Sequence, residues 1–298
     1  MKKILYCLLL GIILFASFKT YENYSLYRNA TDVHLLKMSD RPRVSLTDNQ
    51  ILIAHGGGAL EVKADYYSTV TNAIEAFNQN YHNGLRWFEI DFSLTSDNKI
   101  IGRHDWHHYL YENYLGQVDP VENDQPLSYT EAKNLEIYRK YHAATAKTIV
   151  DFLVKHTDAR IIIDTKNQET EEYLQILEEI NKSCDVNKEV LSRIIPQIYT
   201  TDQYEPVSKL GYYENLLLTL YSNNETNPQI IDFVKNNKKI IAVAFGQDAY
   251  YQRKDLIVPI HELGKEVFIF SVDKSSDATR YFNEGIDGIY TNFLIPQH

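Results

Sequence analysis

Short apolar runs separated by stretches that fit helices recur along the chain from residue 51 to residue 291. The eight runs that fit strands are Ile51–Ala54, Trp87–Leu94, Arg160–Lys166, Ile194–Tyr199, Leu216–Tyr221, Ile240–Phe245, Val267–Val272 and Gly288–Thr291. Strict alternation of strands and helices predicts a parallel sheet, because parallel strands need a crossover connection. Eight such units in roughly 250 residues predict a closed (β/α)8 barrel of the TIM type. A doubly wound open sheet is the alternative architecture.

The region 49–298 is predicted to form one domain, since no Pro/Gly-rich linker divides it. Between the second and third runs, the stretch from Trp106 to Gln125 is rich in His, Tyr, Asn and Asp. It predicts an irregular insertion beside the site. Ser128 followed by Glu131 is a capping-box pattern that marks the start of a helix.

The composition excludes some function classes. The net charge is −10 and no stripe of Lys and Arg is visible, so a nucleic-acid-binding protein is not expected. The two cysteines are Cys7 and Cys184. A mature domain that holds only Cys184 has no disulfide framework and no cysteine-based metal site.

The N-terminus has the pattern of a targeting segment. Lys2 and Lys3 precede an apolar run from Ile4 to Phe18, so residues 1–18 fit a signal anchor or a signal peptide. As a helix the run spans roughly 22 Å, short of the ~30 Å bilayer core. Residues 19–48 are polar and are expected to form a stalk or linker. The domain is therefore predicted to be extracytoplasmic, held to the membrane by this segment or secreted if the segment is cleaved.

Two acids in the second run point to a metal. Glu89 and Asp91 share one face of a strand, while Phe88, Ile90 and Phe92 form the opposite, apolar face. Two like charges side by side are costly unless a cation compensates them. A divalent metal, Ca²⁺ or Mg²⁺, is the simplest compensation because hard cations bind carboxylate oxygens. Two solvated acids at a strand end are the alternative.

Further polar residues end or follow the first three runs, where a barrel places catalytic groups. They are His55, His104, Asp164 and Lys166. A metal held by three carboxylates neutralises phosphate oxygens, and a lysine adds a positive charge for the same phosphate. Two histidines can act as base and acid, because their pKa lies near working pH. The set suits phosphodiester cleavage.

The ordered series of motifs resembles the glycerophosphodiester phosphodiesterase family from about residue 51 to residue 294. The matching motifs are His55, Asn72 to Phe77, Glu89-Ile90-Asp91, Leu94 to Asp97, His104-Asp105, Asp164-Thr165-Lys166, Phe270 to Asp273 and Gly285 to Asn292. The resemblance implies a TIM-type barrel, a divalent metal, and hydrolysis of a glycerophosphodiester to glycerol phosphate and an alcohol. It also implies residue roles: His55 and His104 as the acid–base pair, Glu89, Asp91 and Asp164 as metal ligands, and Lys166 as a phosphate contact.

The chain departs from that family's pattern in three places. His55 is followed by Gly56-Gly57-Gly58 where the family usually has His-Arg-Gly, so backbone N–H groups of Gly56 and Gly57 are predicted to bind phosphate in part. Asp164 stands where the family usually has Glu, a pattern that is similar to sphingomyelinase D-type phospholipases. Phe270-Ser271 replaces the more usual Trp-Thr. The first two departures bear on the substrate more than on the reaction class.

Three more residues are candidates for the pocket: Gln197 and Tyr199, which end the fourth run on one face, and Trp106 as a wall or lid anchor. The expected substrate is a small-molecule or lipid-derived phosphodiester, including glycerophosphate polymers. Two alternatives stay open. One is a phospholipase of D or C type acting on intact lipid, and the other is a catalytically inactive barrel that serves as a surface binding module.

Overall fold

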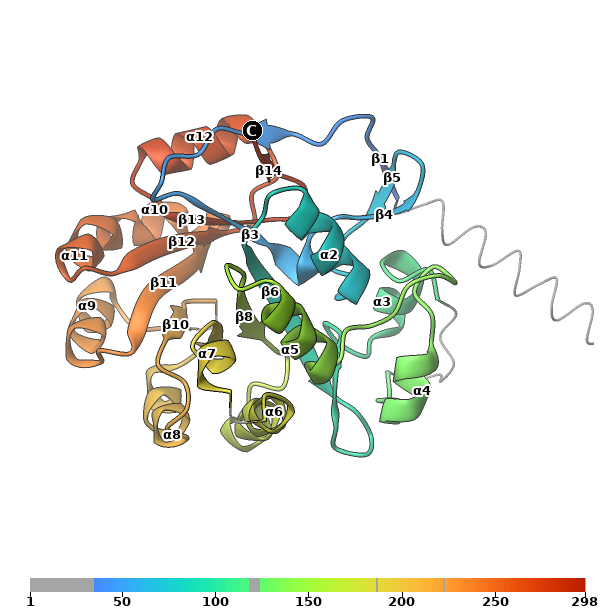
Figure 1. The fold of residues 1–298 in the computed structure, drawn as a ribbon. Helices are drawn as coiled ribbons and strands as arrows, with labels where there is room; N and C mark the ends of the chain where they lie inside the picture. The colour runs from blue at the N-terminus through green and yellow to red at the C-terminus, as the bar shows by residue number, and fades with distance from the viewer. Residues whose placement is uncertain (1–34, 118–123, 186, 222, 298) are drawn as a thin grey trace, which may run out of the picture.

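The computed structural model describes residues 35–117, 124–185, 187–221 and 223–297, and within these ranges it shows a closed barrel of eight parallel strands (Figure 1). The barrel strands are β3 (Ile51–Ala54), β6 (Trp87–Leu94), β8 (Arg160–Asp164), β9 (Ile194–Ile198), β10 (Leu216–Thr219), β11 (Ile240–Gly246), β12 (Glu266–Phe270) and β13 (Gly288–Thr291). The last strand, β13, pairs in parallel with β3, and β3 pairs in parallel with β6. This closure confirms the predicted (β/α)8 barrel and excludes the open sheet.

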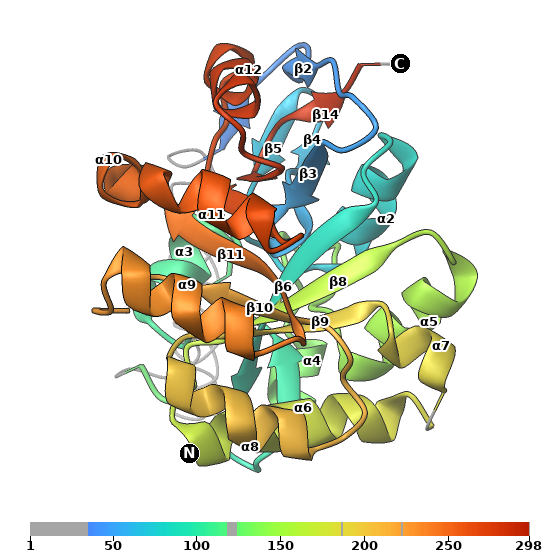
Figure 2. The same cartoon turned by 90° about the vertical axis from the view of Figure 1, so that its left-hand side faces the viewer.

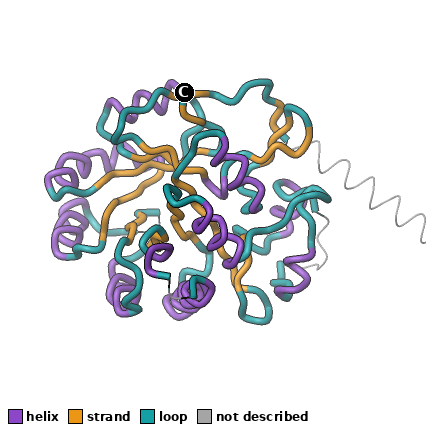
Figure 3. The backbone as a smooth tube through the Cα atoms, viewed as in Figure 1, coloured by secondary structure: helices purple, strands orange, loops and turns teal. Residues whose placement is uncertain are grey.

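Helices surround the strands on the outside, as Figures 2 and 3 show from two sides. They are α2 (Ile74–His82), α5 (Ala146–Lys155), α6 (Thr170–Ser183), α7 (Lys188–Leu191), α8 (Tyr204–Lys209), α9 (Asn227–Asn236), α10 (Tyr250–Arg253), α11 (Ile257–Glu262) and α12 (Ser275–Asn283). Four short 3₁₀ segments, η1 (His55–Gly57), η2 (Thr201–Gln203), η3 (Gln247–Ala249) and η4 (Lys254–Leu256), follow strands or join helices.

The alternation of side chains along each strand divides the core into two parts. On β8, Ile162 belongs to the cluster inside the barrel, while Ile161 and Ile163 belong to the larger cluster between the strands and the helices. All three are completely buried. Each such side chain contributes about 1.5–3 kcal/mol relative to an exposed one. Asp164 follows Ile163 and so projects on the inner side, which is how the strand pattern aims an acid at the centre of the barrel.

Several strands end earlier than the apolar runs suggested. Lys166, Tyr199, Tyr221 and Val272 were expected at the ends of strands, but each lies beyond the last paired residue. The ladder pairing with the neighbouring strands stops before these residues. These positions therefore belong to the loops at the carboxyl ends of the strands.

The insertion after the second strand contains β7 (Ile100–Gly102), which pairs antiparallel with β6, and the helices α3 (His108–Asn113) and α4 (Tyr129–Asn134). Helix α3 lies within the stretch from Trp106 to Gln125 that was expected to be irregular. The capping box of Ser128 and Glu131 is present at the start of α4. A separate small core forms around Ile101, Trp106, Tyr111, Leu127 and Ala132.

Short strands tie the region before the barrel to the barrel domain. β1 (Leu36–Lys37) pairs with β5 (Tyr66–Ser68), which also pairs with β4 (Leu60–Lys63), and β2 (Arg43–Val44) pairs with β14 (Ile295–Pro296). The buried Arg41 donates to the carbonyl of Phe293 over 2.9 Å and also to Asn80. The described part of the expected linker thus packs against the domain predicted to begin at residue 49.

The predicted targeting segment, residues 1–18, lies outside the described residues, as does the linker up to residue 34. Among the residues that are described, no helix has both the length and the apolar character needed to cross a membrane.

Candidate active site

A cavity of about 310 Å³ opens at the carboxyl ends of the barrel strands, where TIM-type barrels carry their active sites. Its lining residues are His55, Glu89, His104, Asp164, Lys166, Gln168, Gln197, Tyr199, Thr219, Tyr221, Phe270, Ser271 and Tyr290. Seven of the residues singled out in the sequence are therefore brought together here. Asp91 is not among the lining residues; it is completely buried and is the ladder partner of Asp164.

Three carboxylates form a cluster at the base of this cavity. Glu89 and Asp91 come from β6, and Asp164 ends β8, where it is the ladder partner of Asp91. One oxygen from each carboxylate lies within 4.8 Å of the other two. Burial raises the pKa of Glu89 well above its usual value, and the charges of Asp91 and Asp164 raise it further. Burial and then the charge of Asp91 likewise raise the pKa of Asp164.

The hydrogen bonds of the cluster leave room for a cation. Glu89 Oε2 accepts from the backbone N–H of Gly56 over 2.6 Å, and Asp91 Oδ2 accepts from Asn72 Nδ2 over 3.0 Å. The second oxygens, Glu89 Oε1 and Asp91 Oδ1, are buried and have no hydrogen-bond partner among the described residues. Buried carboxylate oxygens without a partner are costly. Their number and chemistry fit a hard divalent cation.

Two neighbours on β9 and after it fix the third acid. Asp164 Oδ1 accepts from Gln197 Nε2 over 3.1 Å and also from the Tyr199 hydroxyl. The Tyr199 hydroxyl further accepts from the backbone N–H of Thr165 over 2.8 Å. Gln197 and Tyr199 line the cavity as expected, but their polar atoms orient a carboxylate of the cluster.

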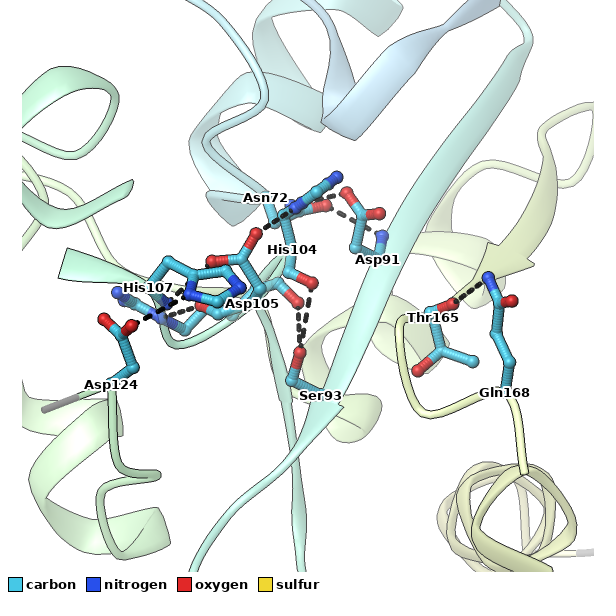
Figure 4. A network of polar contacts seen from close by, with 10 residues as sticks. Asn72, Asp91, Ser93, His104, Asp105, His107, Asp124, Thr165 and Gln168 are labelled. Carbon is cyan, nitrogen blue, oxygen red and sulfur yellow. Dashed lines mark hydrogen bonds and ion pairs between the residues drawn. The ribbon is translucent and has the colours of Figure 1, made fainter. Parts of the chain in front are cut away.

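The two histidines are held by different partners. His55 Nδ1 lies 3.0 Å from Asn292 Oδ1, whereas His104 Nδ1 lies 2.5 Å from a carboxylate oxygen of the adjacent Asp105. Figure 4 shows the His104–Asp105 pair beside Ser93, whose hydroxyl donates to the backbone carbonyls of residues 103 and 104.

The Asp105 contact changes the protonation of His104. Burial lowers the pKa of His104, but the hydrogen bond that His104 donates to Asp105 and the charge of Asp91 outweigh burial, so the pKa is above its ordinary value. For Asp105, burial raises the pKa, but the bonds from His104 and from the His107 N–H outweigh it and leave the pKa lowered. The pair therefore favours an imidazolium beside a carboxylate.

Lys166 supplies a positive charge to the cavity. Burial lowers its pKa, but the charges of Asp164 and Asp91 outweigh burial, so the ammonium is retained. Its Nζ lies 5.5 Å from the centre of the Tyr221 ring, and among the described residues no salt bridge joins it to Asp164. An ammonium in this position can bind an anionic group.

Three predicted contacts lie elsewhere. Trp106 is not among the cavity-lining residues, because its ring packs in the small core of the insertion and its Nε1 donates to the carbonyl of Leu94 over 2.9 Å. Gly56 and Gly57 are also absent from the lining. The N–H of Gly56 is directed at Glu89, and the carbonyl of Gly57 accepts from Asn80 over 2.7 Å.

Sequence reasoning did not identify Asn292, Asn72 or Tyr221 as parts of the site. Asn72 and Asn292 lie inside motifs that were recognised, so their position in those motifs was a usable signal. Asp273, which ends another of those motifs, accepts a hydrogen bond from Asn292. No sequence signal marked Tyr221, which was expected in a strand.

Comparison with protein families matches residues 63–295 to the glycerophosphoryl diester phosphodiesterase family, and the chain belongs to this family. Comparison with curated proteins finds no match.

Solved structures share the fold at low sequence identity. A glycerophosphodiester phosphodiesterase from Parabacteroides distasonis is 17% identical, with a TM-score of 0.62 over 83% of this chain and 94% of that one. One from Thermotoga maritima is 17% identical, with a TM-score of 0.59 over 83% and 96%. A phosphodiesterase from Oleispira antarctica, solved with the product sn-glycerol-3-phosphate, is 14% identical, with a TM-score of 0.60 over 81% and 92%.

Proposed function

We propose that the protein is a metal-dependent phosphodiester hydrolase that cleaves glycerophosphodiesters, or related phospholipid and glycerophosphate-polymer headgroups, to glycerol phosphate and an alcohol. The observation that carries this proposal is that His55, His104 and Lys166 share one cavity with the buried acidic cluster. Family membership supports the reaction class, and the product bound to the Oleispira antarctica phosphodiesterase supports the glycerol phosphate half of the substrate.

Glu89, Asp91 and Asp164 would hold the metal, which when bound neutralises charge on the phosphate oxygens. Lys166 binds a phosphate oxygen through its ammonium group. Glycines follow His55 where the family usually has an arginine, and the N–H of Gly56 is directed at Glu89. Among the described residues that line the cavity, Lys166 is the one Lys or Arg, so we assign the phosphate contact to it.

The partners of the histidines assign the proton transfers. His55 Nδ1 faces the side-chain oxygen of Asn292, which leaves Nε2 to accept a proton from the attacking hydroxyl. His104 Nδ1 faces the Asp105 carboxylate, which favours the imidazolium form. His104 can therefore donate a proton to the departing alcohol oxygen.

A substrate panel tests the proposal. Purified protein is incubated with glycerophosphocholine, glycerophosphoethanolamine, or phosphatidylcholine vesicles, each with Ca²⁺, Mg²⁺ or EDTA, and released glycerol phosphate and alcohol are measured. We expect turnover of at least one glycerophosphodiester with metal and loss of turnover in EDTA.

The other outcomes discriminate the alternatives. Turnover of intact lipid without turnover of the deacylated diesters would establish a phospholipase. Folded protein that turns over no phosphodiester with any metal would overturn the proposal in favour of a binding module.

A further inference from the structure

An aspartate and an asparagine form a chain of hydrogen bonds behind His55. Asp273 follows β12, and Asn292 follows β13, the neighbouring barrel strand. Asp273 Oδ2 accepts from Asn292 Nδ2 over 2.9 Å, and Asn292 Oδ1 lies 3.0 Å from His55 Nδ1. Asp273 Oδ1 also accepts from the backbone N–H of Asn292 over 2.7 Å and from the Thr291 hydroxyl over 3.0 Å.

The carboxylate decides which way the amide points. An ionised carboxylate only accepts hydrogen bonds, while a carboxamide has one end that donates and one that accepts. Asp273 therefore takes the NH₂ end of Asn292, and the carbonyl end is left facing His55. The bonds from the backbone N–H and the Thr291 hydroxyl fix the carboxylate in turn, so the amide cannot rotate without breaking the set.

The amide in turn decides the tautomer of the histidine. Asn292 Oδ1 can only accept, so His55 Nδ1 must carry the proton in the neutral ring. Nε2 then holds the lone pair. A general base needs that lone pair, and the opposite tautomer would place an N–H where the proton has to be received.

We propose that Asp273 and Asn292 are positioning residues that set the Nδ1–H tautomer of His55. The role of His55 as base rests on the proposed function, but the tautomer does not. Other charged or titratable side chains share the cavity with His55: Glu89, His104, Asp164, Lys166, Tyr199, Tyr221 and Tyr290. None of them is hydrogen-bonded to the ring, so Asn292 alone among the described residues sets the tautomer.

A purely structural role for Asp273 predicts a different result. In that case Asp273 would fix the loop after β13 through Thr291 and the Asn292 backbone, and the imidazole would be indifferent to it. The distinction needs a measurement on the ring itself. Two-bond ¹H–¹⁵N NMR spectra of protein labelled with ¹⁵N-histidine distinguish a protonated from an unprotonated ring nitrogen, and His55→Gln assigns the His55 signals.

Two variants test the chain of bonds at different distances. Asn292→Leu removes the acceptor with little change of volume, so His55 should lose its Nδ1–H preference and kcat on glycerophosphocholine should fall roughly 10- to 100-fold, with KM nearly unchanged. Asp273→Asn touches no atom of His55, yet it releases the amide of Asn292. It should shift the His55 tautomer in the same direction.

Two further variants serve as rescue and control. In Asn292→Asp the new carboxylate still accepts from Nδ1–H, so Nδ1 should stay protonated, while the imidazolium form becomes more favourable than in the wild type. Asp287→Asn is the matched control, because Asp287 Oδ2 also binds a histidine, His261 Nε2 over 2.8 Å, and a backbone N–H. Asp287 precedes β13, at the opposite end of that strand, so His55 should be unaffected.

A folded Asn292→Leu protein with the wild-type His55 tautomer would overturn the proposal. So would Asp273→Asn that lowers Tm and leaves the ring signals unchanged. If Asp273→Asn does not fold, the contrast between Asn292→Leu and Asn292→Asp decides. The NMR readout needs no substrate, so a tautomer that shifts as expected in a protein that hydrolyses no diester would retain this inference and reject the proposed function.

Discussion

His55 and His104 line the same cavity, but their side chains have hydrogen-bond partners of different kinds. The partner of His55 is a neutral amide 237 residues further along the chain, and that amide is held by Asp273. The partner of His104 is the carboxylate of the next residue, Asp105. The first support exists only because β13 closes the barrel against β3, whereas the second is local.

This contrast in partners underlies the proposed division of the two histidines into a base and an acid. An adjacent carboxylate stabilises the charged imidazolium, while an amide acceptor fixes the tautomer without favouring the charge. A pair of titratable groups whose surroundings push them toward different protonation states is the arrangement that acid–base catalysis requires.

Replacing each histidine should give the largest effect, and the two variants should differ in how the loss depends on the leaving group. We expect His55→Ala to lower kcat/KM by about 10²–10⁴ for every phosphodiester, since a base is needed whatever group departs. His104→Ala should cause a loss of that size for glycerophosphocholine but a much smaller one for a 4-nitrophenyl diester, whose leaving group needs no proton. Steady-state rates on the two substrates give the comparison.

The matched control is His107→Ala. His107 is exposed, pairs with Asp124 over 3.0 Å and does not line the cavity, so its replacement should leave both rates near wild type. Equal losses for His104→Ala on both substrates, with circular dichroism unchanged, would contradict the assignment of His104 as the acid.

Removing the carboxylate beside His104 should give an intermediate effect, on pH dependence. The hydrogen bond that His104 donates to Asp105 raises the pKa of His104 against the opposing effect of burial. In Asp105→Asn the pKa of His104 should therefore fall, and the acid form should be lost at a lower pH. We expect the alkaline limb of the kcat profile to move to lower pH while the acidic limb stays in place. An unchanged alkaline limb would show that this limb does not report His104.

Replacing Trp106 should give the smallest effect. Trp106 packs in the core of the insertion and donates one hydrogen bond to Leu94, away from the cavity-lining side chains. Trp106→Phe should reduce the free energy of unfolding by about 1 kcal/mol, the typical worth of one hydrogen bond, with kcat and KM unchanged. Urea unfolding and steady-state kinetics measure both. A large change in KM would show instead that Trp106 contributes to substrate binding.

Much of the architecture could be predicted from local pattern. Alternating strands and helices indicated the barrel, because each strand must bury both faces and each helix one. The period of two along Glu89-Ile90-Asp91 placed both acids on one side of β6, and the structure brings them together with Asp164. The regular period of the backbone was sufficient for these predictions.

Predictions that depend on contacts between distant segments could not be made reliably from local pattern. The glycines after His55 seemed suited to bind phosphate, but the N–H of Gly56 is taken by Glu89, which lies on another strand. Trp106 lies near the site in sequence, yet the insertion around it forms its own core. The ends of β8 and β9 could not be fixed from composition, because a strand ends where its neighbour stops pairing.

The barrel, the acidic cluster and the two histidines could be predicted from the sequence, since these follow from side-chain chemistry and the period of the backbone. The hydrogen-bond partners of those groups became known only from the folded arrangement. Asn292 and Asp273 meet His55 because ring closure brings the last strand beside the first, and no local pattern records a contact across 237 residues. A hydrogen bond depends on where two atoms finally lie, which only the folded chain specifies.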